Sequence, residues 1–190
     1  PVAFFDPITP ENERWDELGN HPEWSFPPPD YPPFDTIISG FANLVRHHPQ
    51  TTFVGAHVAC YAENLAWVSA LIDECPNLYI DFSARIAELG RIARAARALM
   101  LRHAGRILFG TDAGPDPATY AIYARFLETA DEYFSYSPDP VPGQGRWRIY
   151  GLHLPPDVLA KIYHDNAARL FGLPRRAGAK DNTQPPRRTP

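Results

Sequence analysis

A carboxylate and an imidazole each follow a short apolar segment, and these two side chains are the best placed for chemistry. Asp112 comes after the apolar run of "RILFGTDAG" (106–114), where the chain enters a Gly-Pro turn, and His57 ends the segment "TTFVGAH" (51–57). An imidazole and a carboxylate together can bind a divalent metal such as zinc, or act as an acid/base pair on a metal-bound water. Structural roles are the alternatives: Asp112 can cap the helix that follows, and His57 can be a hydrogen-bonded core histidine.

The segments that carry these residues read as strands of an α/β fold. Short apolar and β-branched runs at 51–57, 77–83 and 106–112 predict three strands. Apolar residues recur at helical spacing in five further segments, 34–48, 62–75, 84–105, 117–134 and 155–172. Strands therefore alternate with helices from residue 51 onward.

The spacing of the strand ends predicts that their polar residues share one edge of a parallel sheet. His57, Ser83 and Asp112 are separated by 26 and 29 residues. A (β/α)8 barrel of about 250 residues has units of about 31 residues and places its chemistry at the carboxyl ends of its strands. A doubly wound open sheet has the same rhythm and also binds ligands there, so periodicity alone leaves both architectures open.

Arg85 is a candidate for substrate binding, because it follows the second predicted strand and could reach a substrate carboxylate at the same edge. A solvated arginine at the start of a helix is the alternative. The remaining histidines are interpreted as surface, packing or helix-end residues: His21, His47, His48, His103, His153 and His164.

Composition places the chain among globular proteins. Of its 190 residues 44% are hydrophobic, and the net charge is −4 with a pI near 6.0, which indicates no nucleic-acid partner. No apolar run is long enough for a membrane span. Cys60 and Cys75 lack a Cys-x-x-Cys spacing, so we expect reduced core thiols and a cytoplasmic protein.

Three segments fall outside the alternation of strands and helices. Residues 1–33 are rich in proline and aromatic residues and predict an irregular cover that packs on the core. Residues 135–154 form a long loop rich in proline and glycine, which predicts a functional lid or a wrapping segment. Residues 174–190 predict a disordered tail.

Four segments in order carry a resemblance to a known family: "HHPQTTFVGAHVA", "ECPNLYIDFSAR", "RILFGTDAGP" and "KIYHDNAARLFGL". Residues 1–173 resemble the second half of the amidohydrolase-related metal-dependent hydrolases, in the subgroup of aminocarboxymuconate-semialdehyde decarboxylase. The resemblance implies the C-terminal portion of a TIM (β/α)8 barrel, with strands six to eight. It implies that Asp112 binds a divalent metal, usually zinc, and orients its water. His57 would act in acid/base transfer, or as a metal ligand in two-metal relatives.

The sequence departs from the family pattern in two ways. The strand-one His-x-His pair and the strand-five histidine are absent, so we expect a fragment that lacks three metal ligands and is inactive by itself. Ala59 stands where relatives usually have glycine, which affects how closely the backbone approaches a substrate.

The function predicted for the intact protein is hydrolysis or non-oxidative decarboxylation of a small carboxylated or amide-type substrate, with zinc as cofactor. The expected partner is the small-molecule substrate, and self-association into a homo-oligomer is left open. A non-catalytic α/β interaction domain that has lost the metal site is the alternative. A His-x-His pair upstream would favour the enzyme.

Overall fold

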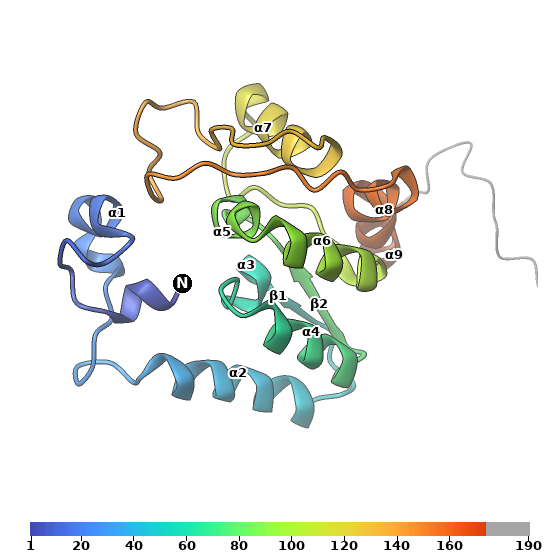
Figure 1. The fold of residues 1–190 in the computed structure, drawn as a ribbon. Helices are drawn as coiled ribbons and strands as arrows, with labels where there is room; N and C mark the ends of the chain where they lie inside the picture. The colour runs from blue at the N-terminus through green and yellow to red at the C-terminus, as the bar shows by residue number, and fades with distance from the viewer. Residues whose placement is uncertain (174–190) are drawn as a thin grey trace, which may run out of the picture.

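The computed structural model describes residues 1–173 and places a three-stranded parallel sheet at the centre (Figure 1). The strand order is β1 (Phe53–Gly55), β2 (Leu78–Asp81) and β3 (Ile107–Leu108). The ladder aligns Gly55 with Ile80 and Ile80 with Ile107. The three predicted strands are confirmed in place, although each is shorter than the apolar run that carries it. The mixed α/β class is confirmed, and the predicted tail at 174–190 lies outside the described residues.

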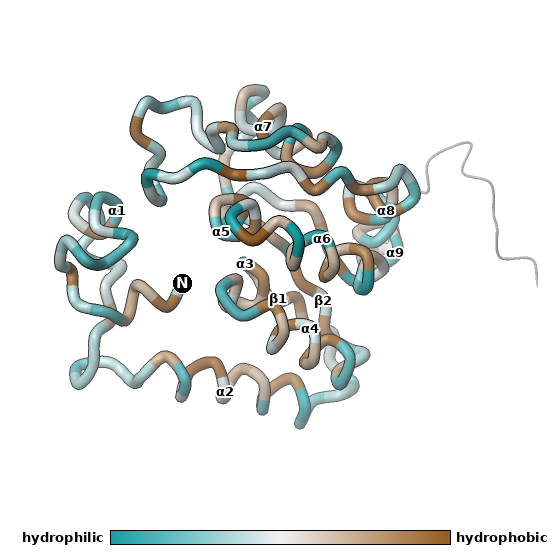
Figure 2. Tube along the Cα trace, in the orientation of Figure 1, coloured by the Kyte–Doolittle hydropathy of each residue, from teal (hydrophilic) through white to brown (hydrophobic). Residues whose placement is uncertain are grey.

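Helices cover one face of this sheet. The main ones are α2 (Phe34–His47), α4 (Leu65–Glu74), α6 (Ala93–Arg102) and α7 (Pro117–Glu128). The strand pairing places the buried residues Leu78, Ile80 and Ile107 on the same face of the sheet. The helices α4 and α6 pack on this face. Figure 2 shows hydrophobic residues concentrated on the strands and alternating with hydrophilic ones along α2. Within residues 1–173, no helix combines the length and hydrophobicity that crossing a membrane requires.

The single helix predicted at 84–105 is two helices, α5 (Ile86–Arg91) and α6, followed by the turn η3 (Ala104–Arg106). The break follows Gly90, whose backbone lies against the side chain of Ile149, where a β-carbon would have no space. The carbonyl of Gly90 accepts a hydrogen bond from Tyr150 N at 3.1 Å instead of continuing the helix. A contact with a segment about sixty residues away therefore ends α5.

The last two predicted helices also differ in detail. α7 ends at Glu128, because the chain turns extended at Thr129 and pairs Phe134 with Ile149 in an antiparallel bridge. The C-terminal helix is continuous but contains a π-helical turn, with the parts α8 (Pro156–Ala160), η4 (Lys161–Asp165) and α9 (Asn166–Phe171).

The C-terminal helix is fixed to the end of β3 by hydrogen bonds. Within the π-helical turn, the carbonyl of Ile162 accepts a hydrogen bond from Phe109 N at 3.1 Å. The amide of the buried Asn166 donates to the carbonyls of Ala104 and Ile107, both at 2.7 Å. These contacts position the chain that leads to Asp112.

The N-terminal segment contains short helical turns where an irregular cover was predicted: η1 (Val2–Phe5), α1 (Trp15–Asn20) and η2 (Pro22–Trp24). Phe34 packs edge-on against Tyr61 at 4.9 Å between ring centroids. Trp15 and Trp24 remain 43% and 40% exposed, so the prediction that this segment packs its aromatic residues on the core is only partly confirmed.

Candidate active site

His57 lies at the end of β1 in an unusual backbone conformation. The turn that follows, α3 (Ala56–Ala59), is left-handed, with φ between 53° and 59° at each of residues 57–60. For L-residues this conformation costs about 1–2 kcal/mol per residue, and such strain concentrates at functional sites. Gly55 permits the turn, because a β-carbon there would lie 3.0 Å from the β-carbon of Ala59. Ala59, the departure noted in the sequence, adopts this conformation without being glycine.

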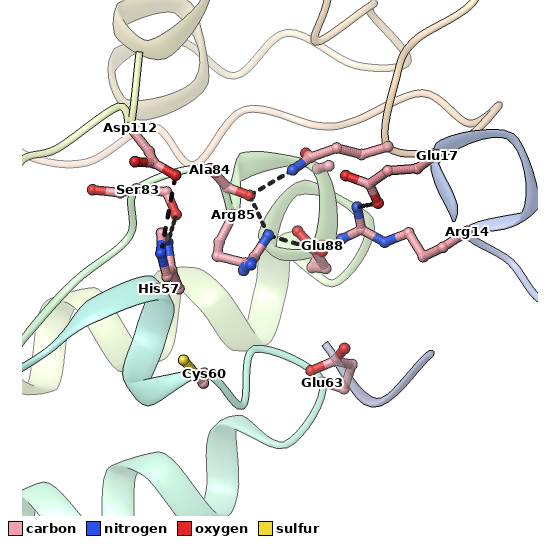
Figure 3. Close-up of polar contacts among 12 residues, drawn as sticks. Arg14, Glu17, His57, Cys60, Glu63, Ser83, Ala84, Arg85, Glu88 and Asp112 are labelled. Atoms are coloured by element: carbon pink, nitrogen blue, oxygen red, sulfur yellow. Dashed lines mark hydrogen bonds and ion pairs between the residues drawn. The ribbon is translucent and has the colours of Figure 1, made fainter. Parts of the chain in front are cut away.

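One hydrogen bond sets the tautomer of His57. Its Nδ1 lies 2.8 Å from the carbonyl oxygen of Ser83, which can only accept, so Nδ1 carries the proton. Nε2 therefore keeps its lone pair in the neutral ring and lies 4.0 Å from Oδ2 of Asp112 (Figure 3). This separation is too long for a direct hydrogen bond, and one water about 2.8 Å from each atom can bridge it. The structure thus brings the two predicted residues together.

Asp112 does not cap the following helix, so the structural alternative for this residue is wrong. α7 is capped by Asp116, whose Oδ2 accepts hydrogen bonds from the backbone N and the hydroxyl of Thr119, both at 2.8 Å. Asp112 lies four residues earlier with φ at 60° and with 60% of its side chain exposed. Its carboxylate is available to a ligand.

Asp81, which the sequence analysis treated only as part of a strand, holds His57 in place. A single carboxylate oxygen, Oδ1, accepts the backbone N–H of His57 at 3.0 Å and that of Ser83 at 2.9 Å. These bonds join the ends of β1 and β2 beyond their ladder. The available signal was an acid that interrupts an otherwise apolar strand.

Tyr123 on α7 plays a similar part between β2 and β3. Its hydroxyl accepts the N–H of Ala84 at 3.0 Å and donates to the carbonyl of Thr111 at 3.2 Å. Burial raises the pKa of Tyr123 to about 12, so the phenol stays protonated and keeps donating at neutral pH. Thr111 immediately precedes Asp112, and the bond therefore fixes the backbone from which that carboxylate projects.

Arg85 is buried, 8% exposed, so the alternative of a solvated arginine is wrong. Its Nη1 donates to the carbonyl of Ala84 at 2.7 Å and lies 3.8 Å from Oε1 of Glu88. Glu88 also pairs with Arg14, whose side chain is fully buried and contacts Glu17 at 2.7 Å. Burial and the nearby Arg14 lower the pKa of Arg85. Figure 3 shows Arg85 between the His57–Asp112 pair and this ionic cluster.

Two further assignments from the sequence can be checked. His103 follows the last residue of α6, as predicted for a helix-end residue, but it is buried and its Nε2 lies 2.8 Å from the hydroxyl of Ser69. Cys75 is buried, but Cys60 is exposed, so the prediction of core thiols is wrong for Cys60.

The described residues do not complete a metal site. His57 and Asp112 are donors that suit zinc or a similar divalent ion. A zinc site needs three or four such ligands, and residues 1–173 contain no group of three or more His, Cys, Asp or Glu side chains that could hold an ion. The two side chains are of the types that bind zinc, but they are fewer than a zinc site requires.

Comparison with known proteins identifies the family. No curated protein and no solved structure matches the chain. A family model described as amidohydrolase matches residues 29–173, which include the whole sheet and the residues at its carboxyl edge. The chain therefore belongs to the amidohydrolase family.

Proposed function

We propose that this chain supplies catalytic residues to a metal-dependent hydrolase or non-oxidative decarboxylase that acts on a small carboxylated or amide-type substrate. The observation that carries the proposal is the facing pair of His57 Nε2 and Asp112 Oδ2, 4.0 Å apart at the carboxyl edge of the sheet. Both residues have positive φ, and neither is used for capping α7. Membership of the amidohydrolase family supports the reaction class.

The chemistry of each residue follows from its surroundings. Asp112, largely exposed, can accept a proton from a water that lies between it and His57. His57, with Nδ1–H fixed on Ser83, can accept or donate a proton through Nε2 alone. This division gives a base and an acid/base group on opposite sides of one water-sized space.

Arg85 is proposed to bind a substrate carboxylate beside this pair. A guanidinium keeps its charge even when it is buried, and its planar fork can hold a carboxylate through two parallel bonds. Within residues 1–173, only Nη1 of Arg85 makes a hydrogen bond, and this bond goes to Ala84. Two nitrogens, Nε and Nη2, are left for a ligand.

The architecture is proposed to be part of a (β/α)8 barrel, with β1, β2 and β3 as strands six, seven and eight. The parallel order and the placement of His57, Ala84 and Asp112 at one edge support this assignment. The missing metal ligands would then come from outside residues 1–173. The aminocarboxymuconate-semialdehyde decarboxylase subgroup is proposed on the four motif segments.

The test is turnover by the polypeptide encoded by the open reading frame that contains this sequence, supplied with zinc. A panel of small amides and aromatic or unsaturated carboxylic acids separates hydrolysis from decarboxylation. We expect Asp112→Asn to lower turnover by about 10² to 10⁴-fold, as for a lost acid/base group, with an unchanged fold. Asp157→Asn, an exposed change on α8, is the matched control.

Near-normal turnover in Asp112→Asn would contradict the proposed role. Failure of the polypeptide to turn over any substrate, together with the absence of a His-x-His pair in its sequence, would favour the interaction domain.

A further inference from the structure

A cavity of about 230 Å³ opens at the carboxyl ends of β2 and β3 and is not used by the roles assigned above. Ala84 and Thr111 line it from the ends of β2 and β3, Ile122 and Tyr123 from α7, and Gln144 from the loop at 135–147. Thr111 is the neighbour of Asp112, so the cavity lies next to the proposed reacting centre. None of the side chains that line it carries a charge.

The wall formed by the long loop is held in place by specific contacts. Gln144 Nε2 donates to the carbonyl of Ala84 at 2.9 Å, and the Tyr136 hydroxyl donates to Gly145 O at 2.6 Å. Trp147 Nε1 donates to the carbonyl of Ala87 on α5 at 3.0 Å. The loop therefore forms a fixed wall, and the cavity needs no closing movement to exist.

The polar groups around the cavity are mostly satisfied within the protein. The hydroxyl of Tyr123 bonds both strand ends, and that of Thr119 donates to Asp116. Gln144 uses its amide nitrogen on Ala84, which leaves its amide oxygen as an acceptor for a ligand. No charged side chain lines the cavity, so a charged group wholly inside it would lose its solvation without a direct ion pair.

Size restricts the ligand further. A cavity of about 150 Å³ holds benzene, and whole-ligand pockets begin near about 300 Å³. The volume of about 230 Å³ therefore suits one planar ring with a small substituent. We propose that this cavity is the subsite for the uncharged part of the substrate, a single ring or a group of similar size that carries one hydrogen-bond donor. Calling that ligand a substrate rests on the proposed function.

Ala84 divides this neutral subsite from the charged side of the site. Its carbonyl accepts from Arg85 Nη1 at 2.7 Å and from Gln144 Nε2 at 2.9 Å. A substrate that spans the edge would place its carboxylate toward Arg85 and its neutral ring beyond Gln144. The charged and the neutral end of such a ligand would therefore lie on opposite sides of Ala84.

The experiment measures binding of phenol and of benzylamine, a cation at neutral pH, to the polypeptide encoded by the open reading frame that contains this sequence, labelled with ¹³C at isoleucine methyl groups, by NMR titration at neutral pH. Ile86 and Ile122 line the cavity and report binding there, while Ile72 lies in the core and serves as reference. We expect phenol to shift both reporters saturably and benzylamine to bind at these methyl groups at least tenfold more weakly. Unmoved reporters with phenol, or equal binding of benzylamine, would overturn the proposal.

Two variants test whether the shifts arise from the cavity. Ile122→Trp fills the space from α7, and Gly143→Trp fills it from an exposed loop position where folding is not at risk. Each should abolish the phenol response at Ile86, and Ile37→Trp, on the exposed face of α2, should preserve it. A response that persists in both cavity variants would refute the assignment.

This measurement needs neither metal nor turnover. If phenol binds as expected and the intact polypeptide has no activity, the result supports the proposed neutral subsite and contradicts the proposed enzymatic function. If activity depends on Asp112 and phenol does not bind, the reverse holds.

Discussion

Asp81 supports His57 through one carboxylate oxygen that accepts two backbone N–H groups. The support matters because residues 57–60 hold a strained left-handed turn, and the bond to His57 N stabilises the residue at which this turn begins. Asp81 also aligns Ser83, whose carbonyl sets the tautomer of His57. A residue that contacts the reacting pair only through the backbone of His57 thus helps to decide which nitrogen of the His57 ring is available.

We expect Asp81→Ala to change the protonation pattern of His57 as well as stability. Two half-buried donors lose their acceptor, at about 1–3 kcal/mol of unfolding free energy each. The Nδ1–H population of His57, measured by ¹⁵N NMR of the ring, should fall as the Ser83 contact loosens. Asp81→Asn keeps an oxygen acceptor and is the control. A ring spectrum unchanged in Asp81→Ala would show that Asp81 does not position His57.

At the scale of the element, α7 is capped by Asp116, whereas the sequence analysis considered Asp112 as the alternative cap. Asp116→Ala removes the acceptor for Thr119 N and should lower the unfolding free energy by about 1 kcal/mol. Asp112→Asn should change it by less than about 0.5 kcal/mol, as for an exposed residue outside the cap. Urea denaturation of both variants measures the difference. A larger loss in Asp112→Asn than in Asp116→Ala would restore Asp112 as the cap.

The packing of α6 against α4 predicts a pH dependence. Burial lowers the pKa of His103 below its ordinary value of 6.5, with a smaller opposing effect from Asp73. The unfolded chain therefore binds this proton more tightly than the folded one. The stability from neutral His103 is complete above about pH 6.5 and is lost as the pH falls from there through the lowered pKa.

His103→Gln should flatten the fall in melting temperature between pH 7.5 and pH 5, and a His48→Gln control at an exposed position should leave it unchanged. An identical pH profile in His103→Gln would contradict the assignment.

How far the sequence predicted these elements depends on the range of the interactions that define them. Apolar runs located all three strands because burial of such residues is a local signal. The break after Gly90 was missed because its cause, Ile149, lies in a distant segment. The places of His57 and Asp112 at strand ends predicted that they share one edge of the sheet, and their side chains lie 4.0 Å apart there. The positions of Asp81 and Tyr123 were not predicted, because they depend on tertiary hydrogen bonds.

At the scale of the whole molecule, the edge strand β1 is exposed at its outer edge and on one face within the described residues. Val54 is 40% exposed on the face opposite to the buried Leu78 and Ile107, and β1 pairs only with β2. An exposed strand edge with apolar residues invites pairing between chains. We expect the 190-residue chain to oligomerise at micromolar concentration in size-exclusion chromatography with light scattering.

Val54→Lys should shift the chain toward monomer, since a charge on an edge strand opposes pairing. Val141→Lys, at an exposed loop position, should not. A sharp monomer peak with a cooperative thermal transition in the unmodified chain would mean that these residues are self-sufficient, and would count against the proposed partial barrel.

The ends of the strands are fastened by side chains, beyond the last pairs of the ladder. Ladder pairing stops at Gly55, Asp81 and Leu108. Past that point one backbone hydrogen bond, from Ala84 N to Thr111 O at 3.2 Å, is joined by bonds to the carboxylate of Asp81 and the hydroxyl of Tyr123. Backbone atoms therefore hold the sheet together, and side-chain atoms help to hold the edge that carries His57 and Asp112. Descendants of this sequence can exchange residues at the edge, and so diverge in what they recognise, while they inherit the sheet register unchanged.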